Sequence, residues 1–172
     1  MPEALLESTP RACSNLAGKY LTFFLHGESY GIEVLKVREI IRLTSITAVP
    51  QMPPYVRGVI NLRGKIVPVV DLRARLELAP ATATERTCIV VVHVRLQSGG
   101  SSHLGLVVDG VEEVLNLAPA EIEETPDFGA KVDIEYFLGI AKVKGRVTVL
   151  LDIDRVLAEA GLERMSQSEP VR

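Results

Sequence analysis

Few residues of this chain stand at spacings that would support chemistry. The three histidines, His26, His93 and His103, fit no metal-ligand pattern. The two cysteines, Cys13 and Cys88, are far apart in the sequence, and no serine or cysteine lies in the strand–turn–helix context of an activated nucleophile. We therefore expect no metal site and no cofactor, and we expect that the protein is not an enzyme.

Two aspartates are the strongest candidates for acid–base chemistry. Asp71 and Asp152 each follow an apolar stretch and precede a short segment with helical character. An aspartate at such a position accepts hydrogen bonds from the first backbone N–H groups of a helix. We therefore interpret both residues as helix caps rather than as a catalytic pair.

The segment closest to a phosphate-binding loop is Asn61-Leu62-Arg63-Gly64-Lys65. It lacks the glycine count, the Gly-Lys-Ser/Thr ending and the following helix that a P-loop requires. Its glycine allows the positive φ of a tight turn, so the segment predicts a hairpin. Arg63 at the tip is either a solvated side chain or an interface anchor, because a guanidinium can bind a carboxylate through two hydrogen bonds.

The elements that carry these residues are duplicated. Residues 30–41 match residues 104–115 in residue class, and residues 58–72 match residues 139–153. Because each half is too small to bury a good core alone, we expect the halves to pack on each other. The pattern predicts a mainly β protein built as two small barrels that share a hydrophobic seam.

Local patterns give the boundaries. β-branched and aromatic residues predict strands at 20–25, 66–70 and 88–94. Residues 153–160, followed by Gly161, predict a helix. We expect His93 inside a buried strand, His103 after a flexible loop, Glu39 on the outward side of a strand, and Val111 and Val114 mainly in the core. The predicted organisation is a flexible leader at 1–18, one domain at 19–164 and a disordered tail at 165–172. The halves of the domain span about 19–80 and 86–157, and they can exchange strands.

Composition limits the class of partner and the compartment. The 172 residues include 47% hydrophobic and 24% charged residues, as in globular proteins, and the net charge is -3. A small barrel with basic turns at 63–65 and 144–146 could bind nucleic acid, but 5% aromatic residues and the negative charge argue against it. The N-terminus is unlike a signal peptide, and the longest apolar runs are too short to cross a bilayer. We therefore expect a soluble, cytoplasmic protein with no membrane insertion. Besides nucleic-acid binding, the other alternative for its function is an enzyme of unknown type.

Several blocks together resemble the CheW family of bacterial chemotaxis coupling proteins, over about residues 19–157. The Asn-Leu-Arg-Gly block, continued by Pro-Val-Val-Asp-Leu, is the most specific of them. The blocks that carry the resemblance are residues 30–32, 37–40, 56–73, 105–111 and 136–140.

The resemblance implies two intertwined, five-stranded, SH3-like barrels with short helices, one of them C-terminal. It implies a non-catalytic adaptor that links transmembrane methyl-accepting chemoreceptors to the histidine kinase CheA, and that is recruited from the cytoplasm to membrane-associated receptor arrays. The kinase's regulatory domain would share the fold and stack barrel to barrel, and receptor tips would bind in the groove between the halves. The positions that match partner-coupling residues of the family are Val37, Glu39, Gly58, Asn61, Arg63 and Val111. The resemblance assigns no further residues to the kinase-facing surface.

Overall fold

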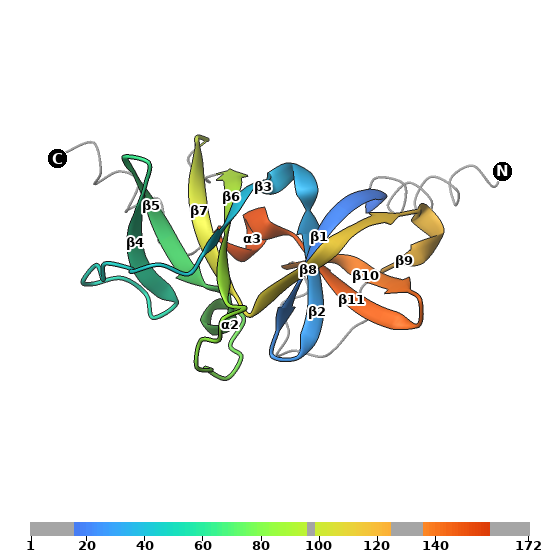
Figure 1. Ribbon diagram of the computed structural model, residues 1–172. Coiled ribbons are helices and arrows are strands. Elements are labelled where there is room, and N and C mark those ends of the chain that lie inside the picture. Colours follow the sequence, from blue (N-terminus) through green and yellow to red (C-terminus); the bar gives the residue numbers. More distant parts are fainter. Residues whose placement is uncertain (1–15, 96–98, 125–135, 159–172) are drawn as a thin grey trace.

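A computed structural model describes residues 16–95, 99–124 and 136–158, and these residues form two β-sheets at opposite ends of the molecule (Figure 1). The strands are β1 (Gly18–Leu25), β2 (Glu28–Glu33), β3 (Val37–Arg42), β4 (Val56–Leu62), β5 (Lys65–Asp71), β6 (Cys88–Arg95), β7 (Ser101–Val108), β8 (Gly110–Leu117), β9 (Ile122–Glu123), β10 (Phe137–Val143) and β11 (Arg146–Leu151). The short helices are η1 (Val34–Lys36), α2 (Leu72–Arg75), η2 (Pro119–Glu121) and α3 (Ile153–Val156).

Each sheet draws strands from both halves of the chain. Sheet A has the order β8-β1-β2-β11-β10-β9, and sheet B has the order β3-β6-β7-β5-β4. The first half therefore gives its opening hairpin to sheet A and its next three strands to sheet B, and the second half does the reverse. The predicted mainly β, two-sheet architecture is confirmed. Sheet A exceeds the expected five strands by the two-residue β9.

The sequence repeat corresponds to a structural repeat. Two parallel strand pairs join the halves: β2 pairs with β11, with Gly31 opposite Leu150, and β5 pairs with β7, with Gly105 opposite Val69. These contacts are equivalent under the repeat, because Gly31 matches Gly105 and Val69 matches Leu150. The two sheets are therefore copies of one design with exchanged strands.

Both sheets close on themselves in the same way. In sheet B, the chain beyond β3 bridges to β4, where Thr47 and Val59 exchange backbone N–H···O bonds of 2.9 Å in each direction. In sheet A, β9 pairs with β10 at the equivalent place, with Glu123 opposite Ile140. These bridges satisfy backbone groups that an open edge strand would expose.

Three apolar clusters fill the part of the molecule that the structure describes. One lies inside sheet B, a second lies inside sheet A, and the largest lies between the sheets. Strand β6 shows how the sequence serves two of them, since Ile89 and Val91 face the interior of sheet B while Val90 and Val92 face the central cluster. A strand buried on both faces is a continuous apolar run, as observed at residues 89–92.

The two aspartates act as helix caps, as predicted. The Asp71 carboxylate accepts from the N–H groups of Arg73 and Ala74 at the start of α2. The Asp152 carboxylate accepts from the N–H of Arg155 in α3. The helix predicted at 153–160 is longer than the observed one: α3 ends at Val156, and Leu157 follows as its C-cap at φ -101° and ψ 0°. Residues 159–161 lie outside the described part. No helix within the described segments is long and apolar enough to cross a membrane.

Two arginines of α2 fix the sheets relative to each other. Arg73 donates from Nε and one terminal nitrogen to Asp109, at 2.9 and 2.6 Å, and so ties α2 to the β7–β8 turn. Arg75 lies between the rings of Tyr55 and Tyr136, at 4.9 and 5.1 Å from their centroids. It also donates to the Tyr136 hydroxyl and to the Val156 carbonyl.

Candidate functional site

The β4–β5 hairpin presents the residues that the sequence singled out. Its two turn residues, Arg63 and Gly64, both have positive φ, 52° and 88°. This geometry matches the right-handed twist of the flanking strands. The Asn61 side chain accepts a hydrogen bond from the Gly64 N–H at 2.8 Å and braces the turn. The predicted hairpin is confirmed, and it holds Arg63 at the tip.

Arg63 forms an ion pair with Glu39 of β3. The hydrogen bond that Arg63 donates to the Glu39 carboxylate, followed by the charge of Glu39, raises the pKa of the Arg63 guanidinium. The Arg63 side chain is 71% exposed and that of Glu39 only 29%. Arg63 is therefore held in place by Glu39 but remains accessible to a partner. Glu39 does not lie on an outward surface as expected, because it points across the open end of sheet B toward the hairpin.

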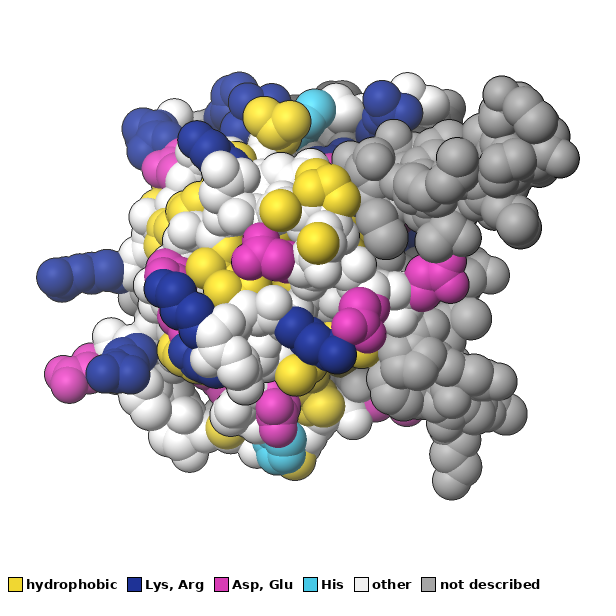
Figure 2. Space-filling view, turned by 90° about the vertical axis from the view of Figure 1, so that its right-hand side faces the viewer, with side chains coloured by type: hydrophobic (Ala, Val, Ile, Leu, Met, Phe, Trp, Pro, Cys, Tyr) yellow, Lys and Arg dark blue, Asp and Glu magenta, His cyan; other side chains and the backbone are white. Residues whose placement is uncertain are grey.

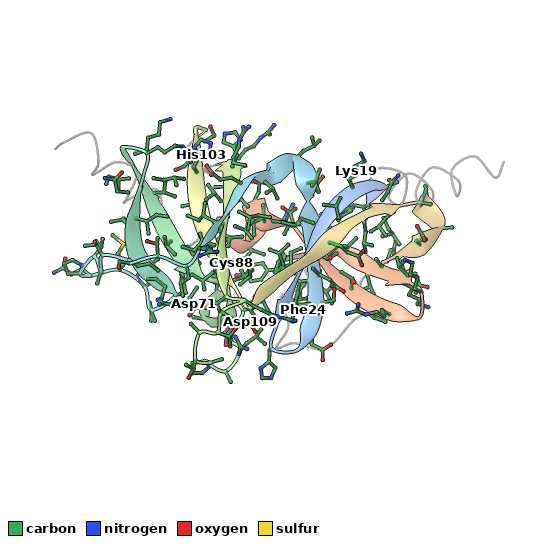
Figure 3. All side chains as sticks on the ribbon, in the orientation of Figure 1. Lys19, Phe24, Asp71, Cys88, His103 and Asp109 are labelled. Carbon is green, nitrogen blue, oxygen red and sulfur yellow. The ribbon has the colours of Figure 1, made fainter. Side chains whose placement is uncertain are left out.

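The pair lies at a hollow of about 430 Å³, which we call the sheet B mouth. Apolar side chains continue the interior cluster of sheet B into it, and charged groups rim it. Figure 3 shows His103 at the end of β7 that lies away from Asp71 and Asp109. The mouth is lined by Arg38, Glu39, Leu62, Arg63, Lys65, Val67, Val91 and His103.

His93 and His103 are cross-strand neighbours on β6 and β7. Their ring centroids are 5.3 Å apart and the rings are tilted by 55°. Burial, followed by the positive charge that His93, Arg38 and Lys65 carry when protonated, lowers the pKa of His103. His93 lies in a strand as predicted but is only partly buried. His103 follows the loop as predicted, but the loop, expected at residues 97–102, ends earlier because β7 begins at Ser101.

Gly58 acts through the backbone. It is buried at φ 141°, and a Cβ there would lie 2.0 Å from the Thr47 carbonyl oxygen, which belongs to the bridge that closes sheet B. Gly139, its equivalent in sheet A, would place a Cβ 2.7 Å from the Glu123 carbonyl oxygen. A side chain at either position would therefore disturb the closing bridge.

The structure does not bring all the candidate residues to one point. Glu39, Asn61 and Arg63 lie together around the mouth, whereas Val37 and Val111 are half-buried against the central cluster. Val111 is thus partly in the core, as expected, but Val114 is 51% exposed.

Sequence reasoning did not find the His93–His103 pair. A signal was present, because the two residues are equidistant from residue 98, in the loop of a predicted hairpin. The Arg75 contacts gave no comparable signal. Among the described residues, no group of three or more His, Cys, Asp or Glu side chains could hold a metal ion.

Comparison with known proteins gives the family. The CheW-like domain model matches residues 19–161, which include both sheets. This chain belongs to the CheW family. The CheW resemblance seen in the sequence is thereby confirmed.

Two curated CheW proteins and one solved structure illustrate the relationship. The chemotaxis protein CheW of Klebsiella aerogenes is 36% identical over 150 residues, which are 84% of this chain and 87% of the relative. That of Bacillus subtilis is 34% identical over 140 residues, 81% of this chain and 86% of the relative. The crystal structure of the scaffolding protein TtCheW from Thermoanaerobacter tengcongensis superposes with a TM-score of 0.71 at 30% identity, covering 83% of this chain and 93% of that one.

Proposed function

We propose that this protein is a non-catalytic adaptor that couples transmembrane methyl-accepting chemoreceptors to the histidine kinase CheA. Its membership of the CheW family supports this function, and one solved relative is described as a scaffolding protein. The observation that carries the proposal is the Glu39–Arg63 pair, which holds an exposed guanidinium at the tip of a rigid hairpin. An arginine held in this way is a typical interface anchor.

The use of the polar groups supports a role without catalysis. Asp71 and Asp152, the carboxylates considered for acid–base chemistry, are both engaged in helix capping. Asp109 is engaged by Arg73 and by the backbone N–H of His26. These carboxylates hold the fold together. The protein would act in the cytoplasm, recruited to membrane-associated receptor arrays.

Repeat-equivalent apolar residues offer surfaces for barrel-to-barrel contact. Ile40 and Ile66 are 45% and 47% exposed on sheet B, and their equivalents Val114 and Val147 are 51% and 56% exposed on sheet A. Figure 2 looks onto the sheet A end and shows apolar side chains near its centre, with acidic and basic side chains among them. A regulatory domain of the same fold would pack on one such surface. A receptor tip would bind between the halves, where Val37 and Val111 lie half-buried against the central cluster.

Coupling then needs only a difference in contact free energy. An adaptor whose contacts differ between two receptor states shifts the kinase by the same difference, typically about 1–3 kcal/mol. Contacts around one anchored arginine and a modest apolar patch are of this size.

The test is the affinity of Arg63→Ala for a CheA regulatory domain and for a receptor cytoplasmic fragment, measured by isothermal titration calorimetry. We expect an unchanged melting temperature and at least a tenfold loss of affinity for one partner. The matched control is Arg146→Ala, because Arg146 lies beside the equivalent turn of sheet A and also pairs with a glutamate, Glu112, at 2.5 Å. Wild-type affinity of Arg63→Ala for both partners would contradict the assignment.

A charge-reversed double variant, Glu39→Arg with Arg63→Glu, separates two roles of the pair. If the pair only braces the hairpin, the reversed pair restores binding. If Arg63 itself contacts the partner, binding stays weak although the protein folds.

A further inference from the structure

The sheet B mouth is cationic in a chain that is acidic overall. Its lining holds Arg38, Arg63 and Lys65 against one carboxylate, Glu39, whereas the whole chain carries a net charge of -3. Arg63 is paired with Glu39. Within the described ranges, neither Arg38 nor Lys65 forms an ion pair with an acidic side chain. The mouth therefore has positive charge that its own acidic residue does not balance.

The floor of the mouth is apolar. Leu62, Val67 and Val91 line it, and all three belong to the cluster inside sheet B. Cations around an apolar floor suit a peptide segment that carries acidic side chains next to an apolar one, because each part would find its complement. A free inorganic anion would use only the rim.

The histidine pair adds titratable charge to this site. His103 lines the mouth, and His93 is its cross-strand neighbour on the same side of the sheet. Among the described residues, the charged groups that line the mouth with His103 are Arg38 and Glu39 from β3, Arg63 from the β4–β5 turn and Lys65 from β5. Arg95 lies two residues from His93 on the same face of β6.

We propose that the sheet B mouth binds an acidic segment of a partner protein, and that His93 and His103 strengthen this binding at acidic pH. The proposal rests on the adaptor function proposed above, since it specifies the chemistry of the partner surface at the same hairpin.

The direction follows from proton linkage. In the free protein, burial and the charges of His93, Arg38 and Lys65 hold the pKa of His103 below its ordinary value and so favour the neutral ring. A docked carboxylate favours the protonated ring and raises this pKa. Binding therefore takes up protons. The affinity rises as the pH falls from the raised pKa of the complex to the lower pKa of the free protein.

The experiment measures affinity between pH 8 and pH 6 by isothermal titration calorimetry, for a CheA regulatory domain and a receptor cytoplasmic fragment in turn. The test variant is His93→Gln with His103→Gln. The matched control is His26→Gln, which removes the third histidine of the chain, in the β1–β2 turn. Buffers of different ionisation enthalpy report the number of protons taken up.

For one partner, we expect the affinities of the wild type and of His26→Gln to increase between pH 8 and pH 6. This increase should be several-fold larger than that of the double variant. If binding shifts the pKa by one unit, the increase can reach about tenfold. Proton uptake near pH 6 should be lost in the double variant. At pH 8, Lys65→Gln should weaken binding of the same partner at low salt, whereas Lys144→Gln at the equivalent turn should not.

The outcomes distinguish this proposal from the adaptor function. If a partner binds but the wild type and the double variant show the same pH dependence, the histidine mechanism is refuted and the adaptor function stands. If Lys65→Gln binds as the wild type does at low salt, the mouth is not the docking site. If neither partner binds at any pH, both proposals fail.

Discussion

Gly58→Ala should destabilise the protein far more than the loss of a single glycine elsewhere, because it breaks the bridge that closes sheet B. The new Cβ would lie 2.0 Å from the Thr47 carbonyl oxygen, so the backbone must move. The movement costs the two 2.9 Å bonds between Thr47 and Val59, about 2 kcal/mol at roughly 1 kcal/mol each. An alanine held at the positive φ of position 58 adds a backbone cost of about 1–2 kcal/mol.

The total of about 3–4 kcal/mol is measurable by urea unfolding and by melting. At about 2–4 °C per kcal/mol for a chain of this size, the melting temperature should fall by roughly 6–16 °C. The matched control is Gly64→Ala, which also has positive φ but no atom within 4 Å of the new Cβ, and it should lose only the conformational part. If the two variants melted within about 2 °C of each other, the closing bridge would not have the role given to it here.

Two further predictions concern the contacts that join the sheets. Arg75→Met should lower the free energy of unfolding by about 2–4 kcal/mol, because charged hydrogen bonds to Tyr136 and Val156 are lost. The control is Arg57→Met: the Arg57 side chain is 45% exposed and lies 3.7 Å from Asp71. Its loss should cost less than about 1 kcal/mol, and urea titration measures both values. For Asp109, burial acts to raise the pKa of the carboxyl, but the Arg73 hydrogen bonds and the His26 N–H together lower it below its ordinary value. A lowered folded-state pKa stabilises the protein above the ordinary pKa of about 3.9, and this stability is lost as the pH falls below it. The stability difference between wild type and Asp109→Asn, followed by melting from pH 7 to pH 3, should therefore shrink below about pH 4, and a constant difference would contradict this explanation.

The hairpin and the caps could be predicted because their causes are local. Gly64 between two apolar runs is sufficient for the turn, and an aspartate before a short helix is sufficient for the cap. Both features need only neighbouring residues.

The strand exchange could not be decided from the repeat. Because the halves are alike, the class pattern is satisfied equally whether β2 pairs with β5 of its own half or with β11 of the other. The choice depends on how the three-residue η1 and the following β3 carry the chain between the sheets, which is a property of the whole fold.

The site was predicted only in part, because its contacts also depend on the whole fold. Glu39 and Arg63 were selected by family motif, but their ion pair spans 24 residues and two strands that are not adjacent in sheet B. The Arg73 and Arg75 contacts reach 36 to 81 residues along the chain. Contacts of this range depend on the packed arrangement, not on local spacing.

The central claim is tested most directly by co-sedimentation. Membranes that contain a methyl-accepting chemoreceptor are mixed with CheA and pelleted with and without this protein. The adaptor function predicts that CheA enters the pellet in proportion to the added wild-type protein, and that Arg63→Ala brings down much less. An equal amount of CheA in the pellet with and without the protein would contradict it.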